Sequence, residues 1–276
     1  MIAVFRLFYK AFMRFVEDDG WAIASHIALT ILMSMFPFLI FLTALAGFFG
    51  SKELADTVAN TLFQTWPEQV AAPIAAEIHN VLTHSQTSPL TLGVALTLYF
   101  SSNGVEALRV GLNRAYEVRD TRPWWLTRLE SIFFVLIGAL ALLAFGFLIV
   151  LAPLIWAGAL HFAPGLQTLE PILNFGRFAI AAALLLPALV LMHKFLPAGR
   201  RTIRDTAPGI MLTFVLWVGA GIAFGLYLSE FARNYVNTYA GLASVMIALV
   251  FLYTLAAIFI FGAELNSAII QPDARG

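Results

Sequence analysis

The sequence contains no cysteine and few charged residues. Of its 276 residues, 12% are charged and 61% are hydrophobic. The lack of cysteine excludes disulfide bonds, thiol catalysis and cysteine-ligated metals. A soluble domain carries about 25% charged residues, and one core of this size cannot hide so large an apolar surplus. The surplus must face lipid, so the chain is predicted to be an all-α polytopic membrane protein.

Catalytic and phosphate-binding motifs are also absent. The chain has no HExxH, GxSxG, P-loop or glycine-rich dinucleotide pattern, and these are the motifs that commonly mark hydrolases, kinases and dehydrogenases. The formal net charge is zero, so no overall field favours nucleic acid. We therefore expect no enzyme activity, no cofactor, no metal and no nucleic-acid partner.

Six apolar segments predict six transmembrane helices within a single membrane domain, residues 1–276. A helix needs roughly 20 residues to cross the hydrocarbon layer. The predicted spans are residues 22–50, 89–113, 131–157, 172–196, 207–228 and 241–270. The second has a polar half, which must be shielded by other helices. Kinks are expected at Pro37, Pro153 and Pro187.

The segments outside the spans are predicted to lie along the membrane surface. Residues 1–20 form an interfacial helix in which Arg6, Lys10 and Arg14 recur every four residues as one basic stripe, a pattern typical of helices at an anionic interface. Residues 51–88 are predicted to form short amphipathic helices on the outer surface, broken at Pro67.

Basic residues predict the orientation. Lys and Arg concentrate in cytoplasmic loops of membrane proteins. With six spans, every basic cluster falls on one side: Arg6, Lys10 and Arg14; Arg114, Arg119, Arg122 and Arg128; Lys194, Arg200, Arg201 and Arg204. Without the second span, the cluster at 114–128 would lie opposite the N-terminus. We therefore predict that both chain ends are cytoplasmic.

The second predicted span ends in a polar stripe. Ser102, Glu106, Arg109 and Asn113, followed by Tyr116, recur at spacings of four and three residues, which places them on one helical face. A charge near the bilayer centre costs roughly 2.5–3.5 kcal/mol, so such a face turns toward protein or water. The stripe is either the wall of a polar cavity open to the cytoplasm or a helix end with a local ion pair.

Glu264 and Asn266 are the polar residues of interest in the last span, near its cytoplasmic end. Either they serve a proton or cation site near the predicted cavity, or they hydrogen-bond neighbouring segments and fix the helix. His193 is expected at the cytoplasmic interface, where a cation favours a helix C-terminus.

Several stretches resemble the YihY/BrkB family of bacterial inner-membrane proteins. The most specific is Gly262-Ala263-Glu264-Leu265-Asn266. The other similar stretches are Phe224–Tyr227, Asn237, Tyr239–Leu242, Ser34–Pro37, and Leu112–Tyr116 with Arg122, Trp124 and Trp125. Ala24–Ile27 departs from the family pattern, so the resemblance implies no role for His26.

The resemblance implies a bacterial inner-membrane location, six spans, both ends inside and an envelope-related role. Members have carried the name ribonuclease BN, but this chain shows no nuclease constellation. Three hypotheses remain open: a transporter or lipid-handling protein, a non-transporting envelope or scaffold protein, and an enzyme. The partners expected are membrane lipids and a lipid or small-solute substrate. The sequence does not determine the oligomeric state.

Overall fold

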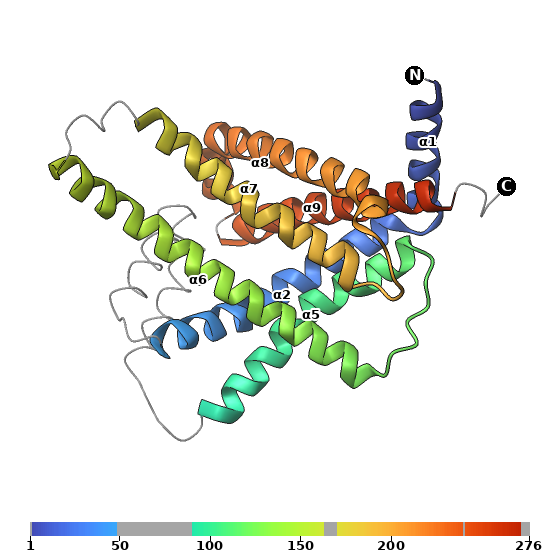
Figure 1. Ribbon diagram of the computed structural model, residues 1–276, viewed down its shortest axis with the longest axis horizontal. Coiled ribbons are helices and arrows are strands. Elements are labelled where there is room, and N and C mark those ends of the chain that lie inside the picture. The colour runs from blue at the N-terminus through green and yellow to red at the C-terminus, as the bar shows by residue number, and fades with distance from the viewer. Residues whose placement is uncertain (1, 49–89, 163–169, 240, 272–276) are drawn as a thin grey trace.

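The computed structural model describes residues 2–48, 90–162, 170–239 and 241–271, and every regular element in these ranges is an α-helix (Figure 1). The helices are α1 (Ile2–Glu17), α2 (Gly20–Phe48), α5 (Leu90–Ala115), α6 (Trp124–Phe162), α7 (Glu170–Phe195), α8 (Ile203–Tyr239) and α9 (Gly241–Ile270). The predicted all-α class is therefore confirmed for these ranges. The surface helices predicted for residues 51–88 lie outside them.

Four of the described helices are long and apolar enough to cross a membrane. The qualifying stretches are Gly20–Leu42, Trp124–Ala144, Ile203–Leu228 and Val245–Ile270. Helix α7 contributes a shorter apolar stretch, Ala182–Phe195. Helix α5 is long enough but more polar, because it carries the predicted stripe. Six spans therefore stay a prediction.

Two helices extend well beyond the predicted spans. Helix α6 begins at Trp124, directly after Pro123, whose carbonyl oxygen accepts hydrogen bonds from Leu126 N and Thr127 N. At about 1.5 Å per residue, its 39 residues reach about 58 Å, more than the about 30 Å hydrocarbon layer. Helix α8 continues to Tyr239. The helices also continue on both sides of Pro37, Pro153 and Pro187, and the kinks at these positions stay predictions.

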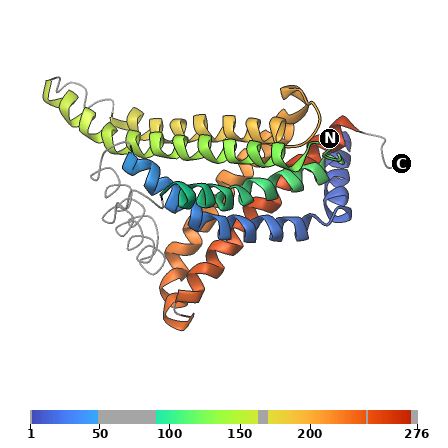
Figure 2. The ribbon, with the colours of Figure 1, turned by 90° about the horizontal axis from the view of Figure 1, so that it is seen from below.

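Helix α9 occupies the centre of the bundle. It contacts α1, α2, α5 and α8, while α6 packs on α5 and α7 packs on α8. Its buried Phe259 and Ile260 share a core with Ile27 of α2, Leu112 of α5 and Leu189 of α7. The chain termini and the α5–α6 and α7–α8 loops lie at one end of the bundle, which we call the polar end (Figures 1 and 2).

Helix α1 lies across the polar end rather than along the bundle (Figures 1 and 2). Phe5 and Tyr9 are 73% and 56% exposed, so an aromatic face is free to meet lipid headgroups. The predicted basic stripe is divided, however. Arg6 is exposed, whereas Arg14 is buried and donates hydrogen bonds to Ser267 Oγ at 3.0 Å and Gln271 O at 2.8 Å. Arg14 therefore anchors α1 to α9.

Helices α8 and α9 cross at two glycines. A Cβ added to Gly209 would collide with the carbonyl oxygen of Gly262, and a Cβ on Gly262 would collide with Thr213 Oγ1. Small residues at such a crossing let two backbones approach closely, which is a common basis of helix packing in membranes. The same approach lets Gly209 N donate a hydrogen bond to Asn266 Oδ1 at 2.6 Å.

We expect Gly209→Ala to destabilise the protein because its new methyl group meets a backbone carbonyl that cannot rotate away. Overpacking of this kind costs about 1–3 kcal/mol or more. Gly219→Ala, on the same helix, is the matched control because nothing lies within 4 Å of its added Cβ. Thermal unfolding of both purified variants, followed by tryptophan fluorescence, should show a lower midpoint for Gly209→Ala alone. Equal midpoints would contradict the close crossing.

Candidate functional site

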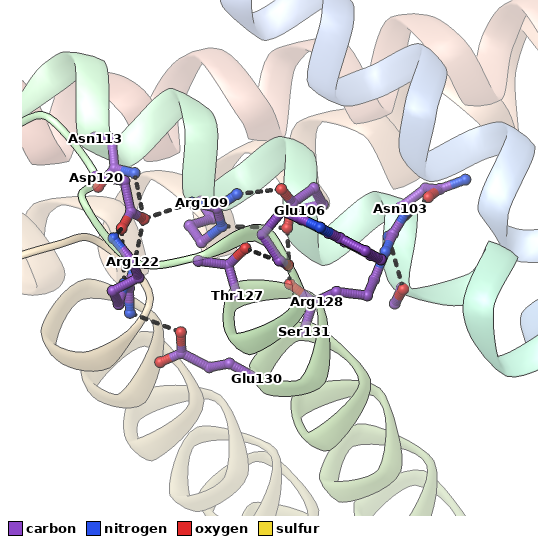
Figure 3. A network of polar contacts seen from close by, with 12 residues as sticks. Asn103, Glu106, Arg109, Asn113, Asp120, Arg122, Thr127, Arg128, Glu130 and Ser131 are labelled. Carbon is purple, nitrogen blue, oxygen red and sulfur yellow. Dashed lines mark hydrogen bonds and ion pairs between the residues drawn. The ribbon is translucent and has the colours of Figure 1, made fainter.

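The predicted site residues fall into two groups at the polar end. Glu106, Arg109 and Asn113 lie on α5 and face α6 and the α5–α6 loop (Figure 3). Ser102, also on α5, contacts Arg128 of α6. Glu264 and Asn266 lie on α9, where they are 1% and 0% exposed. The structure gives hydrogen-bonding partners within the chain to the α5 group and to Asn266. The predicted cavity lined by all six stays a prediction.

Arg109 is the centre of the first group. Its guanidinium donates from Nε to Glu106 Oε2 at 3.2 Å, from Nη2 to Glu106 Oε1, and from Nη1 to Asp120 Oδ2 at 2.5 Å. Glu106 precedes it by one turn on the same helix, whereas Asp120 belongs to the α5–α6 loop. The local ion pair expected from the sequence is therefore present, and a second carboxylate completes it.

Asp120 in turn holds Arg122. Arg122 donates to both oxygens of Asp120, at 2.8 Å from Nε and 2.7 Å from Nη2, and to Glu130 Oε2 on α6 at 2.7 Å. The hydrogen bonds from Arg122 hold the pKa of the Asp120 carboxyl well below its usual range, and Asp120 raises the pKa of Arg122. We call Glu106, Arg109, Asn113, Asp120, Arg122 and Glu130 the stripe network.

Two residues of α6, Arg128 and Ser131, make further contacts with α5. Arg128 Nη1 donates to Ser102 Oγ and Asn103 Oδ1, both at 2.9 Å, and its guanidinium carbon lies 4.0 Å from the centroid of the Tyr99 ring. Ser131 Oγ donates to Glu106 Oε2 at 3.1 Å. Each stripe residue on α5 therefore has a partner contributed by α6 or by a loop.

The stripe network also fixes the α7–α8 loop. Asn113 Nδ2 donates to Asp120 Oδ2 at 3.2 Å, and Asn113 Oδ1 accepts a hydrogen bond from Ala198 N at 2.7 Å. Arg122 Nη2 donates to Leu196 O at 3.0 Å. Two backbone groups of the loop are thus satisfied by side chains that themselves bind Asp120. The network therefore joins α5, α6 and the α5–α6 and α7–α8 loops. The sequence predicts that both loops are cytoplasmic.

The second group centres on Asn266. Its Oδ1 accepts from Gly209 N, and its Nδ2 donates to Tyr116 Oη at 3.1 Å. Tyr116 Oη also lies 3.2 Å from His193 Nδ1, and the His193 and Phe259 ring centroids lie 4.7 Å apart with their planes tilted by 36°. His193 lies in the last turn of α7, as expected, and its side chain is fully buried, while its depth in the membrane stays a prediction. Glu264 lies one turn before Ser267 on the same buried part of α9.

The sequence predicted the polar stripe on α5 but not the residues that bind it. Arg122 entered as a loop charge and as part of a stretch that resembles the family, Arg128 entered only as a loop charge, and Asp120 and Glu130 were not considered. Their own sequence neighbourhood gives one usable signal, because the basic stretch 114–130 contains three acidic residues, Glu117, Asp120 and Glu130. Opposite charges in one loop indicate ion pairing more than a free basic surface.

An open surface cleft of about 550 Å³ lies beside α6, and Arg122 and Glu130 of the stripe network line it. Its lining is apolar except for two charged residues, and it consists of Arg122, Leu126, Leu129, Glu130, Ile132, Phe133 and Leu136. None of the six predicted cavity residues lines it. Among the residues that the structure describes, no group of three or more His, Asp or Glu side chains is arranged to hold a metal ion.

We expect Arg122→Gln to lower the free energy of unfolding by about 1–3 kcal/mol, because it removes charge-assisted hydrogen bonds to two carboxylates. The matched control is Arg119→Gln in the same loop, where the exposed side chain should change stability by less than about 0.5 kcal/mol. Thermal or denaturant unfolding at pH 7 measures both.

The effect of Arg122→Gln should depend on pH. Since folding lowers the pKa of Asp120, its stabilisation is present above the unfolded-state value of about 3.9 and is lost as the pH falls through the lower folded value. The difference between wild type and Arg122→Gln should therefore be constant from pH 5 to 8 and shrink below about pH 4. A difference that grows on acidification would contradict this assignment.

Comparison with known proteins agrees with the fold and the motifs. The family model described as Virulence factor BrkB matches residues 11–275. The ribonuclease-like protein YfkH of Bacillus subtilis (strain 168) is 25% identical over 258 residues, covering 94% of this chain and 93% of the relative. The UPF0761 membrane protein RC1_0578 of Rhodospirillum centenum (strain ATCC 51521 / SW) is 24% identical over 264 residues.

The match to RC1_0578 covers 93% of this chain but only 55% of RC1_0578 itself. No solved structure matches the chain. The family match nevertheless covers nearly the whole sequence, and it includes both the stripe network and the Asn266 group. With its four long apolar helices, the chain is a membrane protein that belongs to the BrkB virulence factor family.

Proposed function

We propose that this protein is a six-span bacterial inner-membrane protein, with both ends in the cytoplasm, that binds and moves a membrane lipid. The observation that carries the proposal is the α6 cleft. Its apolar wall is long, and its two charged residues, Arg122 and Glu130, belong to the stripe network at the polar end. This division into an apolar length and a charged end matches the chemistry of a lipid.

The order of residues along α6 supports this proposal. Leu126, Leu129, Phe133 and Leu136 recur at spacings of three and four, which gives one apolar face. Leu129 and Phe133 are both 58% exposed, so an acyl chain can reach the cleft sideways from the bilayer. Arg122 precedes Leu126 by four residues, so its guanidinium is available to a polar headgroup next to the apolar face.

The arrangement of basic residues supports the proposed orientation. Arg14 binds the end of α9, Asn113 binds the α7–α8 loop, and Arg114 Nη2 lies 2.9 Å from Asp19 Oδ2. The N-terminal helix, both basic loops and the end of α9 therefore share the polar end. By the positive-inside rule this end would face the cytoplasm.

Three other functions are alternatives. A scaffold that binds partners in the membrane is favoured by the stripe network, since its charges are paired within the chain. A solute transporter would need the predicted cavity lined by Ser102, Glu106, Arg109, Asn113, Glu264 and Asn266. A ribonuclease is suggested only by the name of YfkH; RNA cleavage that persists through purification and is lost in a point mutant would support it.

The proposed topology predicts which engineered cysteines react from each side. The chain contains no cysteine of its own, so Arg119→Cys and Lys52→Cys each introduce a single thiol. In sealed vesicles, a membrane-impermeant maleimide should label Arg119→Cys from the cytoplasmic side only and Lys52→Cys from the opposite side only. Labelling of both positions from one side would contradict the six-span arrangement.

Lipid movement predicts an activity in proteoliposomes. A fluorescent phospholipid in the inner leaflet should become accessible to dithionite faster with the protein than in empty vesicles. Leu129→Trp should narrow the cleft and slow this exchange at least about threefold, the effect of under 1 kcal/mol on a barrier. Leu140→Trp is the control, because Leu140 is exposed on α6 but outside the cleft.

The two outcomes separate the candidate functions. Exchange that Leu129→Trp slows and Leu140→Trp leaves unchanged supports lipid handling through this cleft. Exchange no faster than in empty vesicles excludes lipid movement under these conditions and favours the scaffold.

A further inference from the structure

A small polar pocket of about 210 Å³ lies at the polar end, between the α7–α8 loop and the end of α9. Arg200 and Arg201 line it from the loop, Tyr116 lines it from the end of α5, and Ser267 and Gln271 line it from α9. It shares no lining residue with the α6 cleft. Neither the lipid proposal nor the family match assigns it a role.

Arg201 is the unusual member of this pocket. Its guanidinium carbon lies 3.9 Å from the centroid of the Tyr116 ring, and its Nη1 donates to Ala198 O at 2.9 Å. The side chain is only partly exposed, and burial lowers its pKa. In the part of the chain that the structure describes, no carboxylate lies within ion-pairing distance of it. A half-buried cation in this situation favours an anionic ligand.

The pocket is built before any ligand arrives. Asn113 Oδ1 and Arg122 Nη2 hold the loop through Ala198 N and Leu196 O, and Gly199 takes a φ of +91°, which L side chains rarely adopt. On the opposite wall, the buried Arg14 holds Ser267 Oγ and Gln271 O. A ligand would therefore meet fixed groups, which reduces the entropy cost of binding.

The charges that face the pocket sum to a positive value. Asp205 also lines it, but its Oδ2 already accepts hydrogen bonds from Thr202 N at 3.0 Å and Thr202 Oγ1 at 2.6 Å. Two guanidinium groups, those of Arg200 and Arg201, line the same pocket and outnumber this carboxylate. A guanidinium presents a planar fork of donors that matches the oxygens of a phosphate group.

We propose that this pocket binds a phosphate ester, with Arg201 as the principal ligand and Arg200 closing over it from the rim. The phosphate comes either from the headgroup of an anionic phospholipid or from a soluble phosphate ester. Both present the same group to the pocket. The proposal does not depend on the α6 cleft, and its failure would leave lipid movement through that cleft untouched.

The test measures binding to the full-length protein. In detergent, the unfolding midpoint is followed against glycerol 3-phosphate and inorganic phosphate, with sodium chloride at equal ionic strength as the reference. In nanodiscs, the midpoint in phosphatidylcholine alone is compared with that after adding phosphatidylglycerol. A ligand that binds only the folded state raises the midpoint.

Three variants make the test specific. Arg201→Gln should weaken the apparent affinity at least about tenfold, as loss of a charge-assisted contact implies. Arg200→Gln, an exposed change that leaves the Tyr116 contact intact, should weaken it by a smaller factor and guards against a folding defect in Arg201→Gln. Arg204→Gln removes an exposed charge of the same region outside the pocket and should match wild type.

Each outcome decides the proposal. Stabilisation by soluble phosphates that is lost in Arg201→Gln and Arg200→Gln establishes a site for a soluble ester. Stabilisation by phosphatidylglycerol alone, with the same loss, assigns the site to a lipid headgroup. No stabilisation in either arm, or equal stabilisation in wild type, Arg201→Gln and Arg200→Gln, overturns it. Leu129→Trp should leave both arms unchanged.

Discussion

The pairing of Arg109 is the constraint on which the polar end depends. A guanidinium on a helix that borders the bilayer is costly unless its charge is matched, by roughly 2.5–3.5 kcal/mol on insertion scales. Glu106, one turn away, supplies one partner from the same helix, and Asp120 supplies the other from the loop. Because Asp120 must reach Arg109, the loop after α5 folds back on its own helix.

That fold-back determines the shape of the next loop as well. Asp120 binds Arg122 and Asn113, and these two side chains then bind Leu196 O and Ala198 N of the α7–α8 loop. The α5 stripe, which the sequence analysis interprets as a possible cavity wall, therefore also acts as a frame that holds the two basic loops in place. Both proposed ligand sites border this frame, the lipid cleft at Arg122 and the phosphate pocket through the loop that carries Arg201.

Composition and short motifs were sufficient to predict the all-helical class, the membrane location and the family. Helical periodicity also placed the stripe on one face of α5. Periodicity describes one helix at a time, so it could not indicate that Asp120 folds back on Arg109. Spacing likewise predicted that Arg14 faces the membrane surface, whereas it is buried against Ser267, which lies 253 residues away. Contacts at such separations depend on tertiary packing.

The position of the charges bears on how a lipid would enter. The ion pairs made by Arg14, Arg109, Arg114 and Arg122 lie at the polar end. A gate that opened through this end by moving the α5–α6 loop would have to separate Arg109 from Asp120, at a cost of several kcal/mol for a largely buried pair. Entry between α6 and the bilayer breaks none of these pairs. The same network that makes the polar end rigid therefore favours a sideways route for the proposed lipid.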